Sequence, residues 1–92
     1  MPTSMERLEK INEILHKYDY KISNTDLTLQ KIEYFYKDHE NKTLKEISNE
    51  LTRSTNCIKE IMRVLYNVGD LKENKDTGSK DVENYIPTGY VC

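Results

Sequence analysis

Apolar residues recur at helical spacing in four segments of this 92-residue chain. Thr3 and Glu6 open the first segment with the spacing of a capping box. Its apolar positions form a narrow seam of Leu8, Ile11, Leu15 and Tyr18. A narrow seam suits packing of one helix against another. We expect it to be the interface of a homodimer, and the alternative is that it folds back onto the chain's own core.

A second helix is predicted from about Asp26 to Asp38, after a polar connector. The positions expected to face inward on this helix are Leu29, Ile32, Phe35 and Tyr36. Residues 38–42 then link it to the next helix, and Lys42 and Thr43 are predicted to form a very short strand.

The third and fourth segments form a pair of short helices separated by a polar break. Thr43 and Glu46 match a second capping box, and the apolar stripe that follows is Leu44, Ile47 and Leu51. Residues 52–55 form the polar break, and Ser54 within it is the predicted N-cap of the fourth helix. Its buried face is predicted to be Ile58, Ile61, Met62 and Leu65. Gly69 has the position of a C-terminal glycine and closes the helix.

Polar residues occupy the other side of the fourth helix. At about 100° per residue, the side opposite the apolar stripe carries Asn56, Lys59, Glu60, Arg63 and Asn67. We therefore expect this face to be exposed to solvent.

The pattern changes from helical to extended after Asp70. Residues 71–75 and residues 82–86 are predicted as two paired strands, the second ending at Pro87 as an edge strand would. Residues 76–79 carry a turn signal between them. The alternative is a disordered polar tail.

Composition and charge narrow the classes of protein. The chain is 36% hydrophobic and 33% charged, which indicates one small domain with a modest core. The net charge of −2 is unevenly spread: residues 1–41 hold six Lys/Arg and eight Asp/Glu, and residues 42–80 hold eight and six. Without a long apolar run or a secretory signal, a cytoplasmic protein with no membrane contact is expected.

Candidate chemistry is sparse. The two histidines and two cysteines lack the spacing of metal ligands, and no glycine-rich phosphate loop is present. We expect Cys57 to be a partly buried free thiol and Cys92 a terminal one, because cytosolic thiols stay reduced. The sequence thus predicts no enzyme, no cofactor and no metal site.

The run LKEISNEL…STNCIKEIMRVLYNVGDL resembles the helix-turn-helix core of winged-helix DNA-binding proteins, of the small bacterial, archaeal and viral regulator type. The resemblance covers roughly residues 26–88. It implies an α+β fold: a winged helix-turn-helix with an additional N-terminal helix and a C-terminal two-stranded β-wing. Residues 1–25 would be the N-terminal helix and connector, a candidate dimerisation element, and residues 26–92 the DNA-binding domain.

The same resemblance implies sequence-specific binding of double-stranded DNA by a small transcriptional regulator, with helix 54–67 in the major groove. The expected DNA contacts are Arg53, Ser54, Thr55, Asn56, Lys59, Arg63, Lys72, Lys75 and Lys80. Within this set, Asn56 suits adenine and Arg63 suits guanine or a phosphate. The alternative is a winged-helix module that binds another protein and no DNA, since a fold does not fix a function.

Overall fold

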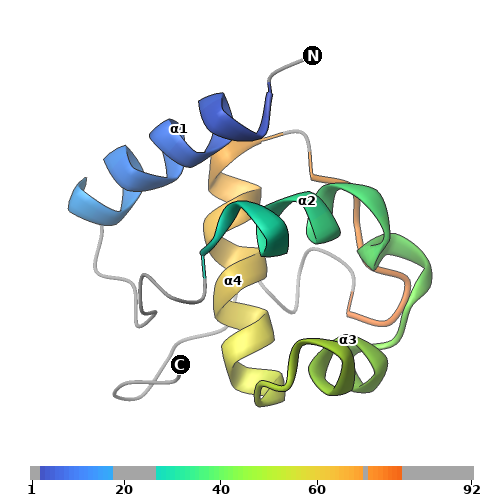
Figure 1. Ribbon diagram of the computed structural model, residues 1–92. Helices are drawn as coiled ribbons and strands as arrows, with labels where there is room; N and C mark the ends of the chain where they lie inside the picture. Colours follow the sequence, from blue (N-terminus) through green and yellow to red (C-terminus); the bar gives the residue numbers. More distant parts are fainter. Residues whose placement is uncertain (1–2, 18–26, 70, 78–92) are drawn as a thin grey trace.

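The computed structural model describes residues 3–17, 27–69 and 71–77. This part of the chain is helical, as Figure 1 shows. Its elements in order are α1 (Ser4–Lys17), α2 (Leu29–Lys37), the short 3-10 helix η2 (His39–Asn41), α3 (Leu44–Leu51) and α4 (Thr55–Val68). None of the described helices is both long and apolar enough to cross a membrane.

Helix α4 is the centre of the packing. Seven of its 14 residues are buried, and they lie on more than one side of the helix. Helix α1 packs against both α4 and α2, and α3 packs against α4. The core comprises Ile11, Leu27, Ile32, Phe35, Ile47, Cys57, Ile58, Ile61, Met62, Val64, Leu65 and Leu71. An all-helical core of this kind is built by burying one stripe of each outer helix on the central one.

The signals for the ends of α3 and α4 are confirmed. The Thr43 hydroxyl accepts from the Glu46 N–H at 3.2 Å, and the Glu46 carboxylate accepts from the Thr43 N–H, so the capping box is complete. Ser54 caps α4 by accepting from the Cys57 N–H at 3.2 Å. Gly69 ends α4 with φ of +102°, a conformation that side chains other than glycine rarely adopt.

The second helix and Cys57 differ from the sequence predictions. Helix α2 begins at Leu29, because Thr28 is its N-cap and accepts from the Lys31 N–H at 3.3 Å. Leu29 itself, predicted to face inward, is exposed. Cys57 is fully buried and disulfide-bonded, so the prediction of a free thiol is wrong.

The seam of α1 packs on the chain's own core. Ile11 has no exposed surface, and Leu8 and Leu15 are half-buried against the core cluster. Tyr18, the fourth residue of the predicted seam, lies outside the described residues. Within one chain the described part of the seam packs on the core, and its use as a dimer interface stays a prediction.

The predicted α+β fold is also wrong, since the described residues form helices and no sheet. Residues 42–43 and 71–75, predicted as strands, form neither a strand nor a bridge, and the second wing strand at 82–86 lies outside the described residues. We call residues 71–77 the strap. It leaves the end of α4 and runs beside η2 to the start of α3 (Figure 1). Its polar groups bind η2 and α3 in place of a neighbouring strand.

Candidate nucleic-acid interface

The turn between α3 and α4 is the most exposed part of the predicted site. All five residues of 52–56 are exposed, and we call them the turn face. Thr52 ends α3 in the left-handed region, with φ of 55° and ψ of 48°. Two hydrogen bonds then fix the backbone: the Arg53 N–H donates to the Ser48 carbonyl at 3.1 Å, and the Ser48 hydroxyl donates to the Arg53 carbonyl. These local bonds hold the turn in place, and its side chains lie at the surface.

The turn face leads directly into the N-terminus of α4. Thr55 and Asn56 are in the first turn of α4 and are exposed. In Figure 1 this end of α4 lies beside α3, whereas α1 crosses the opposite, C-terminal half. The predicted contacts Arg53, Ser54, Thr55 and Asn56 are thus brought together at one end of the molecule.

Farther along α4 the predicted exposed face is only partly correct. Glu60, predicted to be exposed, has no exposed surface, and its carboxylate pairs with the Arg63 guanidinium at 2.8 Å. Lys59 and Arg63 are half-buried, and Asn67 is exposed. The central place of α4 explains the difference, because its neighbours cover part of its polar side as well as its apolar stripe. Arg63 is therefore engaged within the protein.

The described lysines of the predicted wing lie on the strap and not on the turn face. Lys72 and Lys75 are exposed on the strap, and the Lys72 ammonium lies 3.7 Å from the Glu40 carboxylate. The strap meets the start of α3, since the Leu44 N–H donates to the Asp76 carboxylate at 2.9 Å. The turn face follows the end of α3, a helix of eight residues, or about 12 Å. Lys80 lies outside the described residues.

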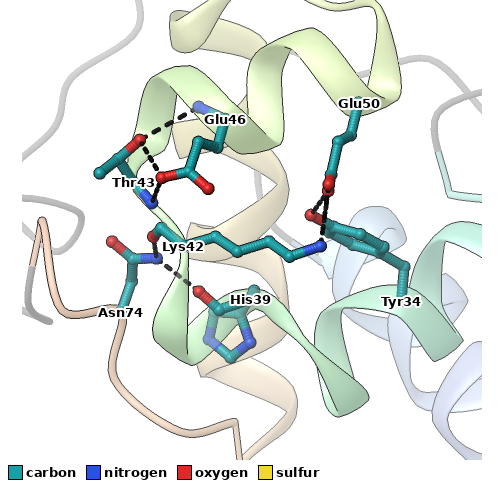
Figure 2. Close-up of polar contacts among 7 residues, drawn as sticks. All are labelled: Tyr34, His39, Lys42, Thr43, Glu46, Glu50 and Asn74. Atoms are coloured by element: carbon teal, nitrogen blue, oxygen red, sulfur yellow. Dashed lines mark hydrogen bonds and ion pairs between the residues drawn. The ribbon is translucent and has the colours of Figure 1, made fainter.

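A charged cluster that the sequence did not suggest lies on the exposed side of α2 and α3 (Figure 2). The Lys42 ammonium donates to both Glu50 carboxylate oxygens, at 2.9 and 2.8 Å, and the Tyr34 hydroxyl donates to the same carboxylate. Burial and the Glu50 carboxylate raise the pKa of Tyr34 to about 12. The hydrogen bond between Lys42 and Glu50 raises the pKa of Lys42 and lowers the pKa of Glu50. The cluster fastens α2 to α3.

A buried polar network holds the strap and was also missed. Asn74 is 1% exposed, and its amide donates to the His39 carbonyl at 2.6 Å and to the Lys42 carbonyl at 2.7 Å (Figure 2). Its side-chain oxygen accepts from the Asp76 and Thr77 N–H groups at 2.9 and 3.1 Å. The second pair is the pattern of an Asx turn, which the run Asn-Lys-Asp-Thr could have signalled. The first pair depends on the tertiary structure and has no local signal.

Comparisons with protein-family models, with curated proteins and with solved structures found no match to this chain. The described residues contain no group of three or more His, Cys, Asp or Glu placed to hold a metal ion. The turn face therefore has to be judged by its own geometry and chemistry.

Proposed function

We propose that this chain is a helix-turn-helix protein that binds double-stranded DNA through the turn face and regulates transcription. The observation that carries the proposal is the exposure of five consecutive polar residues, from the end of α3 into the first turn of α4. In helix-turn-helix proteins the N-terminal residues of the second helix contact base edges in the major groove. The matching positions here are the first turn of α4.

The residue types on the turn face suit DNA. Arg53 supplies a planar cation for a phosphate or for the two acceptors of guanine. Asn56 carries one donor and one acceptor, the pair that adenine presents in the major groove. Ser54 and Thr55 have hydroxyls that donate to phosphate oxygens at the positive end of α4.

The burial of Glu60 removes an objection to DNA binding. An exposed carboxylate in the middle of the contact helix would repel phosphate, but this one is enclosed and paired with Arg63. Because of this pairing, the main role of Arg63 is to stabilise the protein by neutralising the buried Glu60. We accordingly assign base contact to Asn56 and Arg53, with Lys59, half-buried at the margin, as a phosphate contact.

The test begins with selection of bound sequences from random double-stranded oligonucleotides. Binding of the double variant Arg53→Ala/Asn56→Ala to a selected duplex is then measured by fluorescence anisotropy over a range of salt concentrations. Loss of a base contact should cost about 1–3 kcal/mol, and loss of a phosphate contact should lower the salt slope by about one.

A matched control is available on α1, which crosses the other half of α4 (Figure 1). Lys10→Ala/Asn12→Ala removes the same charge and the same amide from exposed positions. This control should bind the selected duplex as the unaltered protein does. Equal binding by both double variants would refute DNA contact through the turn face.

A homodimer is part of the proposal. A single helix-turn-helix covers few base pairs, so specific binding usually needs two copies on half-sites about 34 Å apart. The predicted interface is the seam of α1, of which Leu8 and Leu15 keep part of their surface exposed beside the core. Sedimentation with a duplex holding two half-sites should show two chains per duplex, and one chain per duplex would contradict it.

One observation favours a second candidate, a module that binds another protein. The chain is acidic, with a net charge of −2 and a pI near 5.7, and strong DNA binders are usually basic. Retention on heparin at low salt that is lost in Arg53→Ala favours DNA. Absence of retention, together with failure of the oligonucleotide selection, favours the protein partner.

A further inference from the structure

His39 has an arrangement of hydrogen bonds that depends on its protonation. It lies in η2 and is 2% exposed. Its Nδ1 is hydrogen-bonded to the Phe35 carbonyl of α2, and its Nε2 lies 2.5 Å from the Lys72 carbonyl of the strap. Both partners are backbone oxygens, which accept hydrogen bonds and cannot donate them.

A neutral imidazole carries one N–H, whereas the protonated ring carries two. Only the protonated ring can therefore donate to both carbonyls. In a neutral ring, one nitrogen lone pair would face a carbonyl oxygen in a buried place, and that carbonyl would lose its donor. We propose that His39 is a proton-dependent latch, which fastens the strap to α2 when protonated and loosens it when neutral.

The charged residues near His39 do not take over the hydrogen bond that the ring loses when it is neutral. On the α2 side the chain carries Lys37 and Asp38, on η2 Glu40, and on the strap Lys72. Glu40 and Lys72 pair with each other at 3.7 Å. Both hydrogen-bond partners that the structure gives the ring are carbonyl oxygens, so no carboxylate among the described residues is bonded to it.

The hydrogen bonds of Asn74 and Lys75 involve no group that gains or loses a proton between mildly acidic and mildly basic pH, so a change in them would follow from the loosening at His39. The Asn74 amide does not titrate, and the Lys75 N–H donates to the Glu40 carbonyl at 3.1 Å from backbone to backbone. The carboxylate of Asp76 accepts from the Leu44 N–H at 2.9 Å. Deprotonation of His39 should therefore loosen the strap beside Lys72 and leave the helices folded. The latch would act whether or not the chain binds DNA.

Amide hydrogen exchange tests the latch, with rates corrected for their intrinsic dependence on pH. Between about pH 5.5 and about pH 8, where histidines lose their proton, protection of the Lys75 amide should fall roughly tenfold, since a buried carbonyl loses its donor. Amides in the middle of α4 serve as the internal reference and should change much less. Equal changes in the strap and in α4 would overturn the proposal.

Two further measurements separate the latch from a merely structural role. In His39→Gln the protection of the strap should no longer depend on pH, whereas His16→Gln, at the only other histidine, should keep the dependence. Nitrogen NMR of the unaltered protein gives a result even if His39→Gln fails to fold. Both ring nitrogens of His39 should carry protons while the strap is protected. A single N–H in that state would overturn the proposal.

Discussion

The turn face and the strap are both short polar segments that adjoin α3, one after its end and one at its start. Residues of both were predicted to contact DNA, yet the structure gives them different surroundings. Every residue of the turn face is exposed, and its backbone bonds to positions nearby in sequence, as in the pair Ser48 and Arg53. In the strap, Leu71 and Asn74 are buried, and Asn74 bonds to residues 32 and 35 positions away.

The difference shows how the backbone decides the use of a polar side chain. Where a turn satisfies its own N–H and C=O groups locally, side chains stay available for a ligand. At the end of η2 the His39 carbonyl accepts from the Lys42 N–H at 3.3 Å, and both the His39 and the Lys42 carbonyl accept from the Asn74 amide; buried carbonyls need such donors. Asn74 supplies that donor twice. The turn face thus leaves its side chains available for the proposed contact with DNA, while the strap stabilises the fold.

The largest expected effect is the loss of Asn74. Asn74→Ala removes four hydrogen bonds at once, two given and two received. At about 1 kcal/mol for each bond, the free energy of unfolding should fall by about 2–4 kcal/mol. Urea unfolding followed by circular dichroism measures the change.

Asn49→Ala is the matched control for that variant. Asn49 is exposed on α3, where alanine is the better helix former, so stability should hold or rise slightly. If Asn74→Ala cost no more than Asn49→Ala, the strap would not be a structural element, and the contrast between the two segments would be lost.

The helices of this chain could be predicted because their signals are local. The capping box at Thr43, the N-cap at Ser54 and the closing glycine at Gly69 all concern residues within one turn of the helix end. The strap could not be predicted, because residues 71–75 carry no local signal for their partners, which lie in and just after η2. Hydrophobic periodicity and secondary-structure propensity contain no information about which distant backbone carbonyls need a hydrogen-bond donor.

The site could be predicted in part for the same reason. Exposure of residues 53–56 follows from their place in a short turn between two amphipathic helices. The burial of Glu60 and its pairing with Arg63 depend on how many elements surround α4. A helical wheel assumes one covered face, and a central helix has more than one.

A smaller effect is expected on the turn face. Ser54→Ala removes the acceptor of the Cys57 N–H and should lower the free energy of unfolding by about 1 kcal/mol. Thr55→Ala alters the next residue, which is exposed and is not the cap, and should change stability by less than about 0.5 kcal/mol. Chemical denaturation of the two variants measures both values. Equal losses would show that the cap does not hold the turn.

An increase in stability is expected at Thr52. A β-branched residue in the left-handed region costs about 1–2 kcal/mol, and glycine avoids that cost while losing about 0.5–1 kcal/mol through its greater freedom in the unfolded chain. Thr52→Gly should therefore raise the free energy of unfolding by about 0.5–1 kcal/mol. Thr55→Gly, placed in helical conformation in α4, should lower it. A loss in Thr52→Gly as large as that in Thr55→Gly would contradict strain at the end of α3.

The smallest expected effect concerns the surroundings of Lys42, whose carbonyl accepts from Asn74 of the strap and whose ammonium donates to Glu50 of α3. In Glu50→Gln the pKa of Tyr34, about 12, should fall toward its ordinary value of 10.0 and stay above it, because burial still raises it. Carbon NMR of the tyrosine rings measures this titration. Since folding raises the pKa of Tyr34, the stability it adds is complete below pH 10 and is lost as pH rises through about 12. Glu46→Gln, at an exposed position of α3 outside this cluster, should leave the titration unchanged. An unaltered pKa in Glu50→Gln would contradict the bond between Tyr34 and Glu50.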